Sequence, residues 1–311
     1  TAWKNRIHRS VEILFPGFLN RELTGIVAFC SASLALMEED FSCLKIKRSR
    51  LDTLVRQLHR HGTQKPEEAA VKLKALADRV LAPPPLLIPA EAASLGTKVR
   101  MLRAVRDAIA MEENQMARCL VQTPGFYLTS IPGIGVVLAA HIMAEYRCPD
   151  RWPPADNMAS YAGIVPRQTQ TGGSGSPPKV GHLPLDANHV LKDYLLQAAY
   201  HAGTTGEHRL QEHYQRVEHR DGKSRLSTAK LLVRILRRMV LTETIYLPPA
   251  ILHPEQPLPQ GYVAAYCQEV TARLAEKWKP YDLSGIDPES NRLQQWKASV
   301  SDIVRFTTQN V

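Results

Sequence analysis

Residues 164–187 combine hydroxyl and cationic side chains in a stretch with few apolar residues. The hydroxyls belong to Thr169, Thr171, Ser174 and Ser176, and the cations are Arg167 and Lys179. A hydroxyl nucleophile that attacks a phosphodiester needs a flexible approach and cations that hold the non-bridging oxygens. Composition alone favours a Gly/Ser-rich surface loop without chemistry, so only a motif match can favour the catalytic interpretation.

The same stretch is rich in residues that interrupt helices and strands. These are Pro166, Gly172, Gly173, Gly175, Pro177, Pro178, Gly181 and Pro184. We expect no regular element at this density, and a loop this long is uncommon unless it is functional or disordered. Gly172 and Gly173 would leave the backbone beside Thr171 uncrowded, so that a phosphate can come within reach.

A second candidate is the turn SIPGIG, which places Pro132, Gly133 and Gly135 directly before the apolar run 136–144. Glycines at a helix entrance allow another backbone to pass close by, and the N–H groups of the first turn face outward at the positive end of the helix dipole. This pattern is typical of a helix-hairpin-helix that grips phosphates without reading bases. A turn that only starts a buried helix would have the same sequence.

A third candidate is a basic helix within residues 209–247. Ser227 and Thr228 form a plausible N-cap pair. After them the pattern turns Leu231, Leu232, Ile235, Leu236 and Met239 inward and Lys230, Arg234, Arg237 and Arg238 outward, with Lys223 just before the helix. The outward cations would contact phosphates, one per turn; the alternative is a solvated face on a core helix.

The overall composition agrees with a nucleic-acid partner, because the 39 Lys and Arg against 30 Asp and Glu give a formal charge of +9. Many soluble proteins are as basic as this. The five cysteines are scattered and never spaced as CxxC, which favours a reducing cytoplasm without a disulfide framework or a zinc site. We predict no metal site, no signal peptide and no membrane span. His201, His208 and His213 are expected at the surface.

The elements that must position these residues are almost all helices, so the predicted fold class is all-α. Apolar residues recur at helical spacing over 20–62, 67–81 and 91–120, and the last segment carries one apolar stripe from Leu95 to Leu120. Long helices with one stripe pair with each other or with a second chain. We therefore expect either a coiled-coil-like arm that supports a homo-oligomer or an ordinary helical bundle.

The C-terminal region is predicted to be a separate appendage. Residues 248–260 contain five prolines, a linker composition. A short amphipathic helix over 261–278 and a weakly ordered tail to Val311 follow. No function is assigned to this region.

Three pieces of the chain together resemble the IS110 family of bacterial insertion-sequence transposases, also described as bridge-RNA-guided recombinases. The first is SIPGIG (130–135) with Ala140, Ile142 and Glu145, and the second is Tyr161–Gly163 with Pro166, Arg167, Thr171 and Gly172. The third is Asn188, Leu191, Leu195, Ala198 and Ala199, followed by Tyr214 and Gly222–Lys223. KNRIH (4–8) and FPGF (15–18) resemble the segment that leaves the family's first domain.

The resemblance implies a composite site. A hydroxyl from this chain forms a covalent bond to DNA phosphate, and an acidic RuvC-like domain holds Mg²⁺. DNA and a structured guide RNA are the implied partners. The family's nucleophilic serine falls at Thr171, with Ser174 as the alternative. The resemblance divides the chain into a linker remnant (1–19), a helical arm (20–125), a transposase domain (126–247) and the linker and tail (248–311).

Two departures weaken the case for activity. No acidic RuvC-like domain is found in these residues, which is expected of a fragment, a pseudogene product or a truncated derivative. The family's basic Lys-Arg-Gly-Asn stretch is here Leu185, Asp186, Ala187 and Asn188. The competing hypotheses are a non-catalytic nucleic-acid-binding or assembly remnant of a degenerated transposase, and a purely structural helical scaffold.

Overall fold

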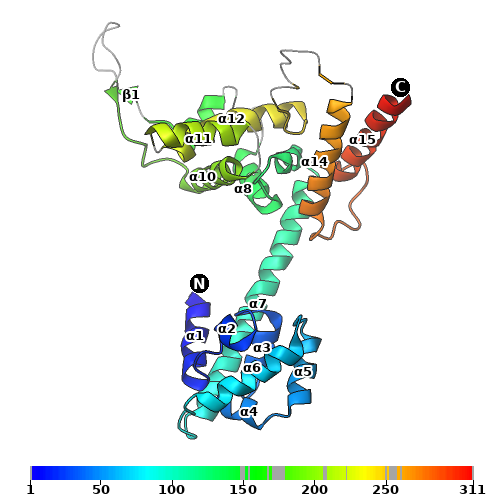
Figure 1. The fold of residues 1–311 in the computed structure, drawn as a ribbon. Helices are drawn as coiled ribbons and strands as arrows, with labels where there is room; N and C mark the ends of the chain where they lie inside the picture. The colour runs from blue at the N-terminus through cyan, green and yellow to red at the C-terminus, as the bar shows by residue number, and fades with distance from the viewer. Residues whose placement is uncertain are drawn as a thin grey trace. The chain divides into compact units, whose positions relative to one another are not determined.

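The structure, a computed structural model, forms two compact units, Thr1–Met111 and Glu112–Val311, and each is described by itself (Figure 1). It describes residues 2–147, 151–152, 155–166, 168–169, 179–205, 209–221, 223–248, 251, 258–259 and 261–309. The helices dominate both units, so the all-α prediction is confirmed.

The first unit consists of short helices around an aromatic core. These are α1 (Ala2–Leu14), α2 (Arg21–Thr24), α3 (Ser31–Met37), α4 (Cys43–Arg48), α5 (Leu51–Arg60), α6 (Pro66–Arg79) and the first part of α7 (Ile88–Leu120). Where the sequence pattern indicated helix over 20–62, the chain is divided into four helices. The side chains of Asn20 and Ser42 accept N-cap hydrogen bonds, and Gly25 ends α2 in the left-handed region.

The core of the first unit is built on Phe15, Phe18 and Phe41, whose ring centroids lie 4.7–6.0 Å apart. The stripe of α7 contributes Leu95, Val99 and Leu102, which are buried. Farther along α7 this changes, because Val105, Ile109 and Met111 are exposed in this chain. Pairing of this stretch with a second chain stays a prediction.

The second unit has a single hydrophobic core that joins all its major helices. They are the 3₁₀ helix η1 (Pro124–Ser130), α8 (Val136–Tyr146), α9 (Ala155–Tyr161), α10 (His189–Thr204), α11 (Arg209–Asp221), α12 (Ser224–Thr242), α14 (Tyr262–Trp278) and α15 (Arg292–Gln309). Val270, Leu274 and Trp278 of α14 belong to the same buried cluster as Leu195 of α10 and Leu236 of α12. The helix α14, which was predicted to lie in a separate appendage, is therefore part of this core.

Two expectations about regular structure were wrong. Within 164–187, Gln168–Thr169 (β1) pairs antiparallel with Lys179–Val180 (β2). Such a short ladder needs only backbone groups, and most of the breakers lie between its strands. Residues 292–309 also form a helix where a weakly ordered tail was expected. Asn291 caps it, and Nε1 of Trp296 donates to Oγ1 of Thr271 on α14 at 2.9 Å.

Candidate nucleic-acid interface

The turn between η1 and α8 owes its shape to two glycines. Gly133 has a φ of +80°, and a Cβ added there would lie 2.4 Å from the carbonyl oxygen of His201 on α10. Only glycine therefore lets the turn pack this closely on α10. At Gly135, by contrast, an added Cβ would meet no atom within 4 Å. Pro132, which directly precedes Gly133, is half-buried.

Gly135 is the N-cap of α8, and no side chain among the described residues caps this helix end. The first N–H groups of a helix have no partner within it and carry the positive end of its dipole. Open space at Gly135 leaves a path to them from outside. Ile131, Ile134 and Val136 are buried beside them, so the turn both starts a core helix and presents backbone donors.

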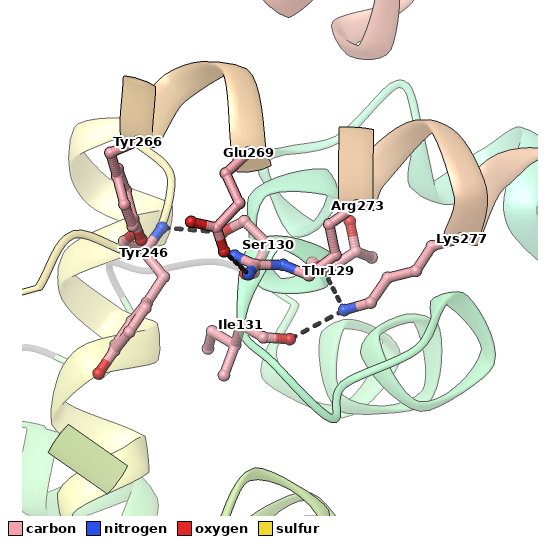
Figure 2. A network of polar contacts seen from close by, with 8 residues as sticks. All are labelled: Thr129, Ser130, Ile131, Tyr246, Tyr266, Glu269, Arg273 and Lys277. Carbon is pink, nitrogen blue, oxygen red and sulfur yellow. Dashed lines mark hydrogen bonds and ion pairs between the residues drawn. The ribbon is translucent and has the colours of Figure 1, made fainter. Parts of the chain in front are cut away.

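The carbonyl side of the turn is held by α14. Nζ of Lys277 donates to the carbonyl oxygens of Thr129 and Ile131 at 2.6 and 2.9 Å (Figure 2). It also donates to the carbonyl oxygen of Ile134 at 2.7 Å. All three ammonium protons are thereby used. Burial, with the nearby charge of Arg273, lowers the pKa of Lys277 to about 7. Lys277 therefore lies behind the turn, on its carbonyl side, and carries a positive charge there only while it is protonated.

Further contacts complete this clamp, by which we mean Arg273, Lys277 and Trp278. Arg273 donates to the carbonyl oxygen of Ser130 at 3.0 Å, and Nε1 of Trp278 donates to Oγ1 of Thr129 at 3.1 Å. The hydroxyl of Ser130 accepts from the backbone N–H of Tyr246 at 2.8 Å (Figure 2). Sequence reasoning missed the clamp. The only signal was the i, i+4 spacing of two cations on an amphipathic helix.

The base of the loop after Tyr161 is fixed by residues from three helices. Nδ2 of Asn188 donates to Oε2 of Glu145 at 2.7 Å and lies 3.0 Å from the hydroxyl oxygen of Tyr161. Oδ1 of the same side chain accepts from the backbone N–H of Leu191, so Asn188 is the N-cap of α10. The backbone N–H of Asn188 donates to the carbonyl oxygen of Tyr161. We call Glu145, Tyr161 and Asn188 the loop anchor.

Most of the loop's predicted site residues cannot be placed. Arg167, Thr171 and Ser174 lie outside the described residues. Lys179 is placed only as backbone in β2. The proposed nucleophile and its cations thus stay predictions, although the anchor defines where the loop leaves and rejoins the helical core.

The basic helix α12 begins one turn earlier than predicted. Its N-cap is Lys223, so Ser227 and Thr228 lie inside the helix and do not cap it. Among its cations, Arg234 and Arg238 are exposed and Lys230 is half-buried. Arg237 departs from the expected outward face, because its Nε donates to the carbonyl oxygen of Trp152 at 2.9 Å.

A polar cluster joins α11 to the start of α12, where His213 is half-buried and not at the surface as expected. Nε2 of His213 lies 2.9 Å from Oγ of Ser227, and an N–H group of Arg216 donates to Nδ1 across 3.2 Å. Because Nδ1 accepts and burial, aided by Arg216 and Arg209, lowers the pKa of the ring, the neutral ring carries its proton on Nε2. His213 therefore donates to Ser227 and is not its general base.

The turn and the loop anchor both lie in a segment that is similar to known proteins. Residues 126–215 match the family model described as Transposase IS116/IS110/IS902 family. A Streptomyces coelicolor protein described as "Insertion element IS110 uncharacterized 43.6 kDa protein" is 30% identical over 107 residues, 34% of this chain and 25% of that protein. Both similarities support a relation to the IS110-type transposases. The chain thus matches about a quarter of the length of this curated relative.

No solved structure matches the chain. In the described part of the chain, we find no group of three or more His, Cys, Asp or Glu side chains that could hold a metal ion. The family resemblance assigns Mg²⁺ to an acidic domain and not to these residues, so no residue of this chain is given a role as its ligand. Every helix among the described residues is too short or too polar to cross a membrane.

Proposed function

We propose that this chain is the nucleic-acid-binding and nucleophile-bearing part of an insertion-sequence transposase of the IS110 family, acting in the cytoplasm. The observation that carries the proposal is that residues 126–215 match the family model and contain both the turn at Gly135 and the loop anchor. DNA is the proposed substrate, and a structured guide RNA is the proposed partner.

In this proposal the turn holds phosphates through the backbone N–H groups at the start of α8, without reading bases. The exposed cations of α12, Arg234 and Arg238, contact the backbone of the same nucleic acid. Arg167, Lys179, Lys223 and Lys230 add positive charge on either side of them. The loop anchor sets the point from which the loop brings its hydroxyl to the DNA.

The chemical step is attack of the Thr171 hydroxyl oxygen on a DNA phosphorus. A bond from this oxygen to phosphorus forms, the bond from phosphorus to the leaving nucleoside oxygen breaks, and the hydroxyl proton is transferred to that leaving oxygen or to solvent. A hydroxyl with a pKa far above 7 needs activation, and the developing charge needs stabilisation. An acidic domain with Mg²⁺, outside these 311 residues, would supply the stabilisation.

The test is to trap and map the protein–DNA adduct with an intact RuvC-like domain supplied as a partner. We expect an adduct at Thr171, more of it with Thr171→Ser because serine lacks the methyl group that crowds the attack, and none with Thr171→Ala. Ser174→Ala is the matched control and should leave the adduct unchanged. An adduct at Ser174 would move the nucleophile three residues along the loop, and unchanged adduct in Thr171→Ala would exclude Thr171.

A second candidate function is a non-catalytic nucleic-acid-binding or assembly remnant of such a transposase. Leu185 favours it, because this side chain is 89% exposed where family members carry a cation. The exposed apolar residues of α7, Val105, Ile109 and Met111, favour assembly into a homo-oligomer. This function predicts salt-dependent binding without any adduct, even for Thr171→Ser.

A further inference from the structure

The helices α10, α11 and α12 enclose a groove outside the turn and the anchor. Its larger part has a volume of about 850 Å³ and its smaller part about 490 Å³. The two parts share Lys223 and Leu226 as lining residues, so they are continuous. We refer to both together as the α10–α12 groove.

The α10–α12 groove has more positive than negative side chains. The larger part is lined by Lys192, Lys223 and Arg225, against Asp193 and Glu218. The smaller part adds two cations, Arg216 and Lys230, and none of its described lining residues is acidic. Over the described ranges, Lys192, Lys223, Arg225 and Lys230 form no salt bridge. Uncompensated cations along a continuous groove fit a polyanion.

The groove also presents an aromatic face. The ring of Tyr200 is 39% exposed, and the guanidinium carbon of Arg225 lies 4.5 Å from its centroid. Tyr214 and His201 contact Tyr200 edge-on, which holds the ring in place. A fixed ring paired with a planar guanidinium is a platform on which a nucleobase stacks. Base faces are accessible only where a strand is unpaired, so this platform does not suit an intact duplex.

The smaller part offers a hydroxyl donor for a phosphate oxygen. The ring of His213 donates to Oγ of Ser227, so the hydroxyl proton of Ser227 is left to point elsewhere. Ser227 lines this part together with Arg216, Lys223 and Lys230. One part of the groove thus has the chemistry for a base and the other has the chemistry for phosphates.

The position of the groove relates it to the loop. Leu183, which follows β2 where the chain returns from the loop toward α10, is one of its lining residues. A strand lying in the groove would therefore run past the base of the segment that carries Thr171.

We propose that the α10–α12 groove binds an unpaired nucleic-acid strand, with one base stacked on Tyr200 and Arg225 and the adjoining phosphates held by Lys223, Lys230 and Arg216. The proposal rests on the proposed function and adds the form of the strand that this surface takes. The shared chemistry is that of single-stranded DNA and single-stranded RNA.

The test measures binding of the full chain to fluorescein-labelled oligodeoxythymidylate and oligouridylate of about 12 nucleotides, and to a duplex of equal length. Tyr200→Leu should weaken single-strand binding about tenfold and change duplex binding by less than about twofold. Tyr200→Phe keeps the ring and should bind as wild type. Tyr262→Leu is the matched control, because Tyr262 is also 39% exposed but lies on α14.

A double variant tests the phosphate contacts. For single strands, Lys223→Gln with Lys230→Gln should reduce the slope of log affinity against log salt by about 1.4. The reason is that two phosphate contacts, and the counterions that each releases on binding, are lost. Lys279→Gln, an exposed cation outside the groove, should leave that slope unchanged. Comparison of oligodeoxythymidylate with oligouridylate shows whether the groove prefers DNA or RNA. Equal binding of the two supports recognition through the base and the phosphates without the sugar.

Equal losses of duplex and single-strand binding in Tyr200→Leu, or no loss of either, would overturn the inference. If Tyr200→Leu unfolds the protein, the inference is still tested by the single-strand affinity of Tyr200→Phe and by the salt slope of the double variant. Steep salt-dependent duplex binding combined with an inert Tyr200 would reject the groove but keep the proposed function. Salt-independent binding of both nucleic acids by the wild type would reject the proposed function itself.

Discussion

The turn at Gly133–Gly135 and the loop anchor are both built around α8 and α10, but they are held in different ways. The anchor is local to the family-like segment, since Glu145, Tyr161 and Asn188 all lie within residues 126–215. The turn depends on Arg273 and Lys277, which lie outside that segment, on α14. A segment can thus carry the recognisable motif while a helix far along the chain sets its shape.

This difference matters for how the turn would bind. The clamp engages the carbonyl oxygens of Thr129, Ser130, Ile131 and Ile134 from one side. The N–H groups at the start of α8 have no side-chain cap. Positive charge on the carbonyl side of the turn and uncapped N–H donors at the start of α8 both favour an anion at Gly135. The C-terminal region is therefore expected to matter for binding as much as the motif does.

The largest effect that we predict is that of Lys277→Met on stability. It removes one donor group from three carbonyl oxygens, so the free energy of unfolding should fall by about 3 kcal/mol. Urea unfolding near neutral pH measures it. Lys279→Met, at the C-cap of the same helix, is the control, because this exposed side chain should change stability by less than about 0.5 kcal/mol. Equal effects of the two substitutions would mean that the clamp does not hold the turn.

The next largest effect should come from Asn188→Ala, which breaks the loop anchor. The change removes the N-cap of α10 and the contacts to Glu145 and Tyr161, and we expect a loss of about 2 kcal/mol. Asn188→Asp keeps the cap but brings a carboxylate to Glu145. Thermal melts of the two variants should therefore show that Asn188→Asp is also destabilised. A wild-type melting temperature for Asn188→Asp would show that the Glu145 contact contributes nothing.

Much of this architecture could be predicted, and the failures have physical causes. The helical spacing of apolar residues predicted the start of α14 to within one residue. The family resemblance included Asn188, which belongs to the loop anchor. Sequence reasoning left 20–62 undivided because Asn20, Gly25 and Ser42 end or begin helices through capping contacts, which apolar periodicity does not detect. It also missed the clamp, because the partners of Lys277 lie more than 140 residues away along the chain.

A smaller and more specific effect is expected from pH. The pKa of Lys277 is about 7 in the folded protein against its usual 10.5. Between these values the unfolded chain holds a proton that the folded protein has released, so the contribution of Lys277 to the free energy of unfolding rises with pH. The stability advantage of wild type over Lys277→Met should widen over this window. Among the described residues, the charged group that shifts this pKa is Arg273 of α14, which lowers it, and the turn supplies backbone carbonyl oxygens.

Binding should respond to pH in the opposite direction. As Lys277 loses its proton above about pH 7, the turn loses the positive charge behind it, so the affinity for duplex DNA should fall by about tenfold or less. Lys277→Met should lack this step. Stability and affinity that rise together across the window would contradict the role given to the ammonium.

The most direct test of the central claim is the affinity of the full chain for duplex DNA as a function of salt. If the turn and the α12 cations grip phosphates, log affinity should fall linearly with log salt between about 50 and 200 mM, by about 0.9 per phosphate contact. Lys277→Met should bind more weakly than Lys279→Met at each salt concentration. Affinity that stays flat across this range would contradict the account.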